Sequence, residues 1–424
     1  MSLKTQFEQF KLKPFLIEAL TDQGFVKPTE IQERLIPGVI NGNSAIGKSQ
    51  TGTGKTLAFL IPLIERIDPE KNECQAIITA PTRELAAQIY QELLKLLPKN
   101  DVYRARKIVG GTDKKRMVSK LKNPPHIVVG TPGRIHDLIK EEALSVYPAA
   151  MLVVDEADQM LDMGFIEDVD QIASRMAENL QMLVFSATIP ENLQPFLKKY
   201  MENPKFVEVK PEQAAAAEIE HLAIDLRHRD KSELLIKIAN SINPYLAIVF
   251  ANTKSHADEA AKALSEAGLN IEVLHGGLQP RERKQVMKRI ERLECQFVVA
   301  TDLASRGIDI KGVSHIINIE LPTDLDFYVH RVGRTGRAGL SGTAITIYNP
   351  EQEEAAVQKL EKRGIAFQFV DVKGEEFIPV KKRVRRKPPQ PQQKASLPKP
   401  KKVKPGYKKK MRQKIEKLNK GKRK

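Results

Sequence analysis

The stretch Ser-Gln-Thr-Gly-Thr-Gly-Lys-Thr, from Ser49 to Thr56, constrains the fold of this chain more than any other segment. Glycines permit positive φ angles, so successive backbone N–H groups can turn inward and form a cradle for an anion. A helix beginning near Lys55 would add the positive end of its dipole to the same place. The pattern predicts a nucleotide-binding loop between a strand and a helix. An ordinary flexible loop before a helix is the alternative interpretation.

Each residue of such a loop has a predictable task. Backbone amides would hold the phosphates of ATP, Lys55 would reach the β- and γ-phosphates, and the Thr56 hydroxyl would bind Mg²⁺. Ser49 departs from the strict pattern, which has a glycine at this position. The predicted nucleotide-binding residues of the loop are Gln50, Thr51, Gly52, Thr53, Gly54, Lys55 and Thr56.

A second signal follows Met151–Val154, a continuous apolar run typical of a strand buried on both faces of a parallel sheet. The run ends in Asp155-Glu156-Ala157-Asp158. Open α/β sheets bind their ligands at the carboxyl ends of strands. We therefore expect Asp155 to hold Mg²⁺ and Glu156 to deprotonate the attacking water. A solvated acidic loop is the weaker interpretation, because a buried strand and a glycine loop accompany the carboxylates.

Apolar runs alternate with helical patterns in both halves of the chain, as they do in doubly wound parallel sheets. In the first half, strands are predicted at 76–80, 126–130, 151–154 and 182–185, with helical periodicity at 56–67 and 84–97. In the second half, strands are predicted at 246–250, 271–274, 297–300, 315–319 and 344–348. The two halves suggest a duplicated fold without an obvious sequence repeat. Because the second half has no glycine-lysine loop, one nucleotide per chain is expected.

The positive charge of the chain is confined to its last residues. Residues 381–424 contain 21 Lys and Arg against one acidic residue, Glu416, which gives this segment a charge of +20. Since the whole chain carries +16, the other 380 residues carry −4. Such a proline-interrupted basic segment cannot bury enough apolar surface to fold by itself. We predict a disordered RNA-binding tail; a solubility tail or, in a eukaryotic host, a nuclear address are the alternatives.

Composition argues against several other classes of protein. No apolar stretch approaches the roughly 20 residues needed to cross a bilayer, and the first residues lack the layout of a signal peptide. Cys74 and Cys295 are the two cysteines, too few for a disulfide scaffold or a cysteine-based metal site. We therefore expect a cytoplasmic protein with no membrane partner.

Further motifs appear in a fixed order, and together they resemble the DEAD-box ATP-dependent RNA helicases. The resemblance covers roughly residues 7–370. It is carried by Asp-Glu-Ala-Asp at 155–158, Ser-Ala-Thr at 186–188, a Q motif at 24–32, Pro-Thr-Arg-Glu-Leu at 81–85, Gly-Gly at 110–111, Thr-Pro-Gly-Arg at 131–134, Val-Phe-Ala-Asn-Thr at 249–253, the segment 300–309, and His-Arg-Val-Gly-Arg-Thr-Gly-Arg at 330–337.

The resemblance implies an α/β fold of two tandem RecA-like domains with parallel sheets. We place the ATP-binding domain at 1–209, a linker at 210–217, the second domain at 218–373 and the basic tail at 374–424. Within the ATP site, the resemblance implies that Gln32 recognises adenine, that an aromatic such as Phe7 stacks on it, and that Asp309 contacts the ribose. Arg334 and Arg337 would act as arginine fingers that stabilise charge on the γ-phosphate.

The same resemblance assigns residues to an RNA surface. Ser186 and Thr188 would couple hydrolysis to unwinding; a local hydroxyl network that caps a strand end is the alternative. Pro280 stands where the family has an RNA-contacting glutamine, although Arg283 is in place. The residues expected to contact the RNA backbone are Pro81, Thr82, Arg83, Gly110, Thr131, Arg134, Arg283 and Thr301.

The predicted function is RNA-stimulated ATP hydrolysis coupled to local unwinding of RNA duplexes. Contacts to phosphates carry no sequence information, so binding independent of RNA sequence is implied. An ATP-gated RNA clamp with little unwinding, and a DNA helicase with the same two-domain core, are the alternatives. The chain most resembles bacterial cold-shock-type helicases, which implies a role in cold adaptation, ribosome assembly or mRNA turnover, with ribosomal or RNA-decay proteins as partners.

Overall fold

The computed structural model describes residues 5–49, 52–100, 102–111, 114–209, 219–302, 310, 312–336 and 341–382, and residues 406, 409, 410, 412 and 413 further along the chain. The side chains of residues 114, 280 and 326 are not among those described. Residues 1–380 form one compact unit and residues 381–424 another. Within the described residues, no helix is both long and apolar enough to span a membrane.

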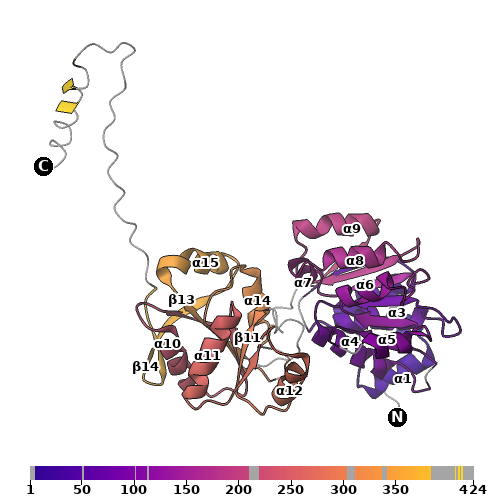
Figure 1. The fold of residues 1–424 in the computed structure, drawn as a ribbon, viewed down its shortest axis with the longest axis horizontal. Helices are drawn as coiled ribbons and strands as arrows, with labels where there is room; N and C mark the ends of the chain where they lie inside the picture. The colour runs from indigo at the N-terminus through magenta and orange to yellow at the C-terminus, as the bar shows by residue number, and fades with distance from the viewer. Residues whose placement is uncertain are drawn as a thin grey trace. The chain divides into compact units, whose positions relative to one another are not determined.

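The first lobe is built on a parallel sheet with strand order β3-β4-β2-β5-β6-β1-β7 in the described residues (Figure 1). Its strands are β1 (Ala45–Lys48), β2 (Ala76–Thr79), β3 (Ala105–Ile108), β4 (Ile127–Gly130), β5 (Met151–Val154), β6 (Gln181–Ser186) and β7 (Lys205–Glu208). Its helices are η1 (Gln6–Phe10), α1 (Pro14–Asp22), α2 (Glu30–Ile40), α3 (Lys55–Arg66), α4 (Arg83–Leu96), α5 (Lys114–Leu121), α6 (Pro132–Lys140), α7 (Ala157–Asp162), α8 (Ile166–Ala173), η2 (Glu191–Leu193) and α9 (Gln194–Tyr200).

The second lobe has a sheet of order β10-β11-β9-β12-β13-β8-β14-β15, parallel except for the last pair. Its strands are β8 (Ile219–Asp225), β9 (Ala247–Ala251), β10 (Ile271–Leu274), β11 (Phe297–Thr301), β12 (His315–Asn318), β13 (Gly342–Tyr348), β14 (Phe367–Lys373) and β15 (Glu376–Pro379). The helices described in it are α10 (Lys231–Asn240), α11 (Lys254–Glu266), α12 (Pro280–Glu291), α14 (Asp326–Val332) and α15 (Pro350–Lys362).

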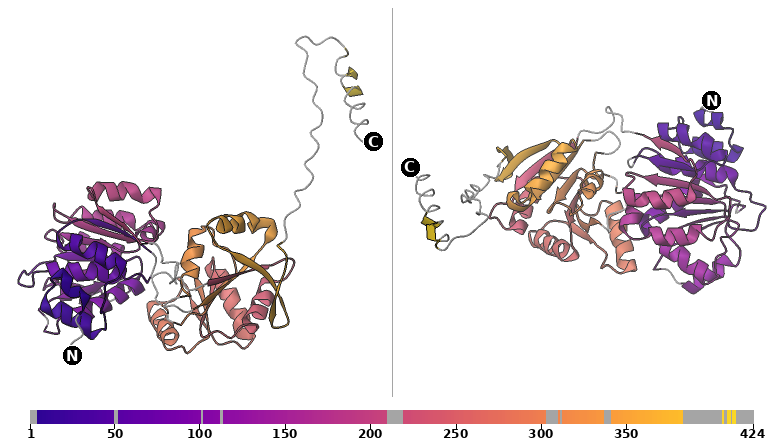
Figure 2. Two further views of the ribbon diagram at one scale, coloured as in Figure 1. Left: turned by 180° about the vertical axis from the view of Figure 1, so that it is seen from behind. Right: turned by 90° about the horizontal axis from the view of Figure 1, so that it is seen from above.

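The two lobes share one topology. Numbered by their own order along the chain, the strands β1–β7 and β8–β14 both lie in the spatial order 3-4-2-5-6-1-7. The expected pair of doubly wound parallel sheets is therefore confirmed. Figure 2 shows helices on both faces of each sheet, as crossover connections between parallel strands require.

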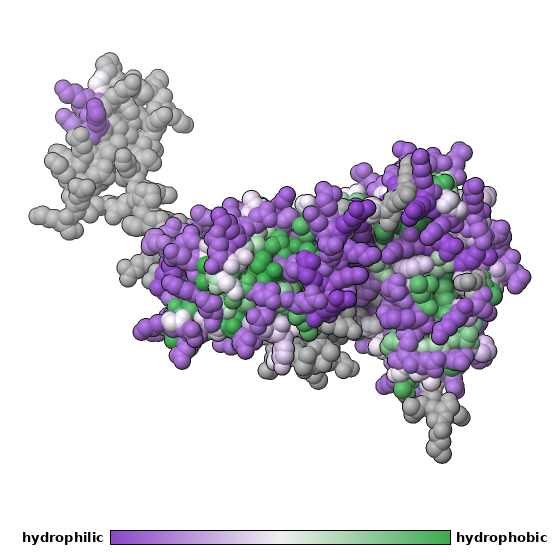
Figure 3. All heavy atoms as spheres, turned by 60° about the horizontal axis from the view of Figure 1, so that its bottom comes forward, coloured by the Kyte–Doolittle hydropathy of each residue, from purple (hydrophilic) through white to green (hydrophobic). Residues whose placement is uncertain are grey.

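Alternation along the buried strands explains why each sheet needs two layers of helices. In β5, Met151 and Val153 belong to the core beneath α3 and α4, while Leu152 and Val154 belong to the core beneath α6 and α8. Successive side chains of a strand point to opposite faces, so a continuous apolar run fills both cores. Figure 3 shows a largely hydrophilic outer face with smaller apolar patches.

The predicted strands are all present, with ends shifted by one or two residues. Strands β1, β3 and β7 of the first lobe were not predicted, because their short sequences mix apolar with charged or small residues. The linker assigned to 210–217 lies outside the described residues, as does most of the basic tail.

The start of the tail at residue 374 is corrected by the structure. Residues 376–379 form β15, which pairs antiparallel with β14 through a turn at Gly374, where φ is +64°. Phe377 packs against the core of the second lobe. The expectation of disorder is therefore wrong for residues 374–380, because an apolar side chain and a glycine turn close a hairpin there.

Candidate nucleotide and RNA site

The predicted site residues of the first lobe follow the carboxyl ends of its parallel strands. The glycine loop follows β1, Asp155 and Glu156 follow β5, and Ser186 ends β6. The predicted RNA contacts follow β2, β3 and β4. Because the strand order is β3-β4-β2-β5-β6-β1, the RNA residues occupy one end of this edge and the nucleotide residues the other.

The glycine loop has the backbone geometry that its sequence predicts. Gly52 and Gly54 have φ angles of +87° and +92°. A Cβ atom at Gly54 would lie 2.5 Å from Gln32 Nε2 and 2.7 Å from Thr29 Oγ1, so this position accepts no side chain. Gln50 and Thr51 lie outside the described residues, while the Ser49 and Thr53 hydroxyls lie 2.8 Å apart and link the two ends of the loop.

Gln32 connects the Q motif to this loop. Its side-chain oxygen accepts the Thr29 backbone N–H at 2.9 Å, and its Nε2 donates to the Gly54 carbonyl at 3.0 Å. A primary amide has two N–H donors and two oxygen lone pairs. Among the described residues, one of the two N–H donors of Gln32 has a hydrogen-bond partner, the Gly54 carbonyl.

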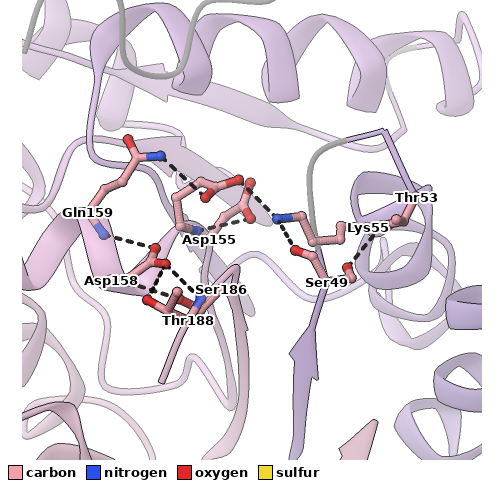
Figure 4. Close-up of polar contacts among 9 residues, drawn as sticks. Ser49, Thr53, Lys55, Asp155, Asp158, Gln159, Ser186 and Thr188 are labelled. Carbon is pink, nitrogen blue, oxygen red and sulfur yellow. Dashed lines mark hydrogen bonds and ion pairs between the residues drawn. The ribbon is translucent and has the colours of Figure 1, made fainter. Parts of the chain in front are cut away.

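Lys55 crosses the loop to meet the carboxylates after β5 (Figure 4). Its Nζ atom donates to the Ser49 carbonyl at 3.1 Å and to Glu156 Oε1 at 3.0 Å. The Lys55 and Glu156 side chains are only 7% and 8% exposed. Glu156 has a left-handed backbone, with φ +53°, which turns the chain sharply at the end of the strand.

Burial and neighbouring charges together set the pKa shifts of Lys55, Glu156 and Asp155. Burial works to lower the pKa of Lys55, but the charges of Glu156 and Asp155 outweigh it, so the pKa is raised. Burial works to raise the pKa of Glu156, yet the Lys55 ammonium holds it below its usual value. Burial and the neighbouring Glu156 charge raise the pKa of Asp155 to about 7. The site therefore holds two carboxyl groups close together with one ammonium between the loop and the strand.

Asp158 joins the acidic segment to the Ser-Ala-Thr segment (Figure 4). Its Oδ2 accepts both the Thr188 backbone N–H at 2.8 Å and the Thr188 hydroxyl at 2.9 Å. Its backbone N–H donates to the Ser186 hydroxyl at 3.1 Å. Gln159, the next residue, donates to Glu156 Oε2 at 3.3 Å. Hydrogen bonds of Asp158 and Gln159 thus link Ser186 and Thr188, the residues predicted to couple hydrolysis to unwinding, to the predicted catalytic base Glu156.

The predicted RNA residues of the first lobe gather at helix starts. Thr82 caps α4 by accepting the Leu85 N–H at 3.1 Å, and Thr131 stands at the N-cap of α6. The Arg83 guanidinium packs over Gly110, where a Cβ would lie 3.0 Å from its Nη2. Arg134 lies in α6, and its buried Nε has no hydrogen-bond partner among the residues that the structure describes. Pro81 precedes Thr82 at the end of β2.

Comparison with known proteins places these features in a family. The sequence matches the DEAD/DEAH box helicase family over residues 29–196 and the helicase conserved C-terminal domain over residues 230–339. It is 59% identical to the DEAD-box ATP-dependent RNA helicase CshB of Bacillus subtilis, covering 99% of this chain and 98% of that protein. The CshB protein of Listeria monocytogenes is 51% identical, with 100% and 99% covered. The chain belongs to the DEAD-box ATP-dependent RNA helicases.

Solved helicase structures have the same fold. Dbp5 of S. cerevisiae, bound to RNA and ADP BeF3, matches with a TM-score of 0.78 at 30% identity, covering 87% of this chain and 95% of that one. Mss116p, bound to ssRNA and AMP-PNP, matches with a TM-score of 0.74 at 28% identity, covering 87% and 79%. This helicase therefore has ATPase activity that serves RNA remodelling, as its family membership shows.

The second lobe of the helicase contributes fewer described site residues. Thr301 ends β11 and is 8% exposed, and Arg334 is equally buried just after α14. Arg283 lies in α12, where its guanidinium pairs with Glu84. Asp309 and Arg337 lie outside the described residues.

Phe7 does not have the exposed ring that stacking on adenine requires. Its side chain is fully buried in η1, where it packs against Phe10 with ring centroids 6.1 Å apart and belongs to the core of the first lobe. The expectation of a stacking role for Phe7 is therefore wrong. Phe25, in the Q motif itself, is only partly buried.

Sequence reasoning missed the central role of Arg331 in the second lobe. This side chain is 1% exposed and binds Asp302 through two hydrogen bonds of 2.5 and 2.7 Å. It also donates to Asn252 Oδ1 at 2.7 Å and to the Glu320 carbonyl at 2.8 Å. One arginine thus ties together the ends of β9, β11 and β12. A charged residue beside the predicted fingers was a signal, but the sequence does not show which arginine is buried.

Proposed function

We propose that this helicase hydrolyses ATP at the carboxyl edge of the first sheet and uses the cycle to separate short RNA duplexes. The observation that carries the proposal is the shared sheet edge. Nucleotide residues follow β1, β5 and β6, while predicted RNA residues follow β2, β3 and β4. The Asp158 hydrogen bonds to Thr188 lie at the nucleotide end of that edge.

In the proposed reaction, Lys55 leaves Glu156 for the phosphates when ATP binds. Glu156 is then free to accept a proton from the attacking water. Arg334 and Arg337 stabilise the charge that develops on the transferred phosphoryl group. Gln32 hydrogen bonds the adenine base, Phe25 offers an aromatic face to it, and Asp309 contacts the ribose.

The residues present fit a magnesium ion that accompanies the nucleotide. Thr56 and Asp155 supply hydroxyl and carboxylate oxygens, the hard ligands that Mg²⁺ prefers. Asp155 is 4% exposed, and burial together with the neighbouring Glu156 charge raises its pKa to about 7. The ion would neutralise phosphate charge and orient the β- and γ-oxygens.

RNA binding in this proposal depends on backbone contacts. The residues Pro81, Thr82, Arg83, Gly110, Thr131, Arg134, Arg283 and Thr301 form the track, and the tail from Lys381 adds non-specific affinity. An ATP-gated RNA clamp with little unwinding is the second candidate. The identity to bacterial CshB proteins supports a cytoplasmic role in cold adaptation, ribosome assembly or mRNA turnover, with ribosomal or RNA-decay proteins as partners.

Two assays on the full chain separate these candidates. We expect single-stranded RNA to raise ATP turnover and ATP to drive displacement of a strand from a short RNA duplex. A turnover rate indifferent to RNA would contradict the proposal. RNA-stimulated turnover without strand displacement would favour the clamp, and stimulation by DNA alone would favour a DNA helicase.

The role of Ser186 and Thr188 has its own test. Replacing both by alanine removes the hydroxyl bonds to Asp158 while leaving the Thr188 backbone N–H bond in place. We expect ATP turnover to persist and strand displacement to fail. Equal losses of both activities in a folded variant would support the local capping network instead.

A further inference from the structure

Gln159 lies directly beside the predicted catalytic base. It is the third residue of α7, after the N-cap residue Glu156, and is 2% exposed. Its Nε2 donates to Glu156 Oε2 at 3.3 Å, while Lys55 donates to the other oxygen, Oε1, at 3.0 Å (Figure 4). Among the described residues, these two are the side chains that hydrogen bond the Glu156 carboxylate.

The third position of a helix has a different task elsewhere in the chain. Gln32 and Glu282 are the third residues of α2 and α12, and the side-chain oxygen of each accepts the backbone N–H of its N-cap residue. This capping box is the usual reason for Gln or Glu at the third position. In α7, the backbone N–H of the N-cap residue Glu156 instead donates to Asp155 Oδ1 at 3.1 Å. Helix capping therefore does not account for Gln159.

Packing does not account for an amide at this position either. The Oε1 atom of Gln159 is buried and has no hydrogen-bond partner among the residues that the structure describes. A buried acceptor without a partner costs stability, whereas an apolar side chain of the same length would fill the space without that cost. A position that breaks a local rule in this way, without a compensating gain in stability, is a candidate for function.

The backbone of Gln159 is held to the Ser-Ala-Thr segment through Asp158. The Gln159 N–H donates to Asp158 Oδ1 at 2.9 Å. The other oxygen of Asp158, Oδ2, accepts the backbone N–H and the hydroxyl of Thr188. Both oxygens of this carboxylate therefore tie the first turn of α7 to the segment after β6. The Gln159 amide thus reaches Glu156 from a backbone that is itself fixed.

We propose that Gln159 is a positioning residue, which orients the Glu156 carboxylate for proton transfer from water once Lys55 has turned to the phosphates of ATP. The inference rests on the proposed function, in which Lys55 leaves Glu156 when ATP binds. From then on, the Gln159 amide is the side-chain donor that remains on the carboxylate among the described residues. A general base must be held in the right direction as well as within reach of its proton, because small misalignments lower the rate.

The first test is Gln159→Met in the full chain, which keeps an unbranched, helix-forming side chain and removes the N–H donor. We expect kcat of ATP hydrolysis with saturating single-stranded RNA to fall about tenfold. This is the lower end of the effect of a hydrogen bond to a charged group, because 3.3 Å is a long bond. The KM for ATP and the affinity for RNA should not change, because the lost bond is not one of the proposed contacts with either ligand.

Gln358→Met is the matched control for this change. It removes an exposed bond of the same kind in α15, from Gln358 Nε2 to Glu354 Oε1 at 3.1 Å. It should leave kcat unchanged. If Gln358→Met lowers kcat as much as Gln159→Met, the effect is not specific to Glu156 and the inference is refuted.

Thermal unfolding separates positioning from packing. Because Gln159→Met removes a buried acceptor that has no partner among the described residues, the melting temperature should stay the same or rise. Gln159→Leu, which also lacks the donor, should reproduce the loss of kcat. Variants that melt at a lower temperature and lose kcat and ATP affinity together would show a packing role and contradict the inference.

A double-mutant cycle tests whether Gln159 acts through Glu156. Single-turnover hydrolysis is measured in the Glu156→Gln background, where Gln159→Met should have no further effect. A further tenfold loss there, as in the wild-type background, would show that Gln159 acts independently of the base and would overturn the inference. If Glu156→Gln lowers turnover while Gln159→Met keeps the wild-type kcat, the proposed function stands and Gln159 is not a positioning residue. If Glu156→Gln itself keeps wild-type turnover, the proposed reaction fails, and the inference fails with it.

Discussion

The two lobes of this helicase have the same strand order, and both join a lysine to a glutamate at the same place. In the first lobe, Lys55 opens the helix after β1 and contacts Glu156, two residues beyond β5, at 3.0 Å. In the second lobe, Lys231 opens the helix after β8 and contacts Glu320, two residues beyond β12, at 2.8 Å. Because β8 and β12 hold the sheet positions of β1 and β5, the two ion pairs are structural equivalents.

The difference lies in the loop before each lysine. Gly52 and Gly54, both with positive φ, precede Lys55. The turn before Lys231 contains Arg227 with φ +52° and Arg229, and both arginines pair with Asp371 of β14. A turn closed by arginine side chains and an aspartate does not offer the inward backbone amides that phosphates need.

The surroundings of the two equivalent glutamates, Glu156 and Glu320, differ as well. Glu156 is paired with a lysine that is 7% exposed, whereas Lys231 is 39% exposed. Glu320 also accepts His256 at 2.7 Å and the Asn252 N–H at 3.2 Å. In the proposed function, the pair therefore serves chemistry in the first lobe, while in the second lobe it joins strand ends. Both lobes have the lysine–glutamate ion pair because they share a fold. In the first lobe alone, the described residues before the lysine include the glycines that are predicted to hold a nucleotide.

The largest expected difference between the equivalent residues is in catalysis. Glu156→Gln should lower ATP turnover about 10²–10⁴-fold, the range for removal of a general base, and leave ATP binding intact. The matched change Glu320→Gln should alter turnover little. Steady-state ATPase assays with RNA measure the turnover of both variants, and nucleotide titrations measure their ATP binding. Loss of ATP binding in Glu156→Gln would contradict its role as base, and an equal loss of turnover in a folded Glu320→Gln would break the comparison.

The lysines should differ in nucleotide affinity. Lys55→Ala removes a charged hydrogen-bond donor from the phosphates and should weaken ATP binding about ten- to a hundredfold. Lys231→Ala should leave ATP affinity unchanged, because no phosphate loop precedes it. Calorimetric titration with ATP and Mg²⁺ measures the two constants. A comparable loss in Lys231→Ala, with thermal stability retained, would point to a nucleotide at the second lobe.

Deleting the basic tail tests how much RNA affinity the two lobes have by themselves. Deleting Lys381–Lys424 removes a charge of +20. RNA affinity should fall about tenfold or more at low salt, and the salt slope should flatten by about 0.7 for each phosphate that the tail would have neutralised. ATP turnover without RNA should not change. An unaltered salt slope would show that the lobes carry the whole interaction.

Residue patterns predict those parts of the fold whose strands are buried on both faces. Strands β2, β4 and β5 consist of four buried residues each, so their apolar runs mark them. Strand β3 lies at the sheet edge, where Arg106 and Lys107 are tolerated. It therefore lacks the continuous apolar run that marks the buried strands. The resemblance names Phe7 as an aromatic residue but does not show whether its ring is buried, which is why the stacking role was assigned to it.

The sequence does not predict which distant residues of the site contact each other. Lys55 and Glu156 were each predicted, but their direct ion pair joins residues 101 positions apart. The Lys231–Glu320 equivalent was not predicted, since no sequence repeat marks it. It follows only from the strand order, which places the carboxyl ends of β8 and β12 at one edge.

The smallest expected effect concerns acid stability of the second lobe. Burial lowers the pKa of His221 to about 4, and its Nδ1 lies 3.0 Å from the hydroxyl of the fully buried Tyr328 on α14. The unfolded chain protonates a histidine near pH 6.5. The unfolded state therefore binds more protons between pH 6.5 and 4, and folding stability falls as the pH drops through that window. Because the ring is only partly buried, we expect a loss of about 1–2 kcal/mol.

The substitution His221→Gln isolates this contribution, because glutamine can bond the Tyr328 hydroxyl but does not titrate. Thermal unfolding at pH 7.5 and pH 5 should show a smaller acid shift for the variant than for the wild-type chain. The first lobe has its own buried histidine, His126, whose pKa is lowered by burial and by Arg104. His126→Gln is therefore the matched control: it should act on unfolding of the first lobe and leave the acid shift of the second lobe in place. If His221→Gln leaves the acid shift unchanged, His221 is not the group whose protonation weakens the lobe that carries Arg334.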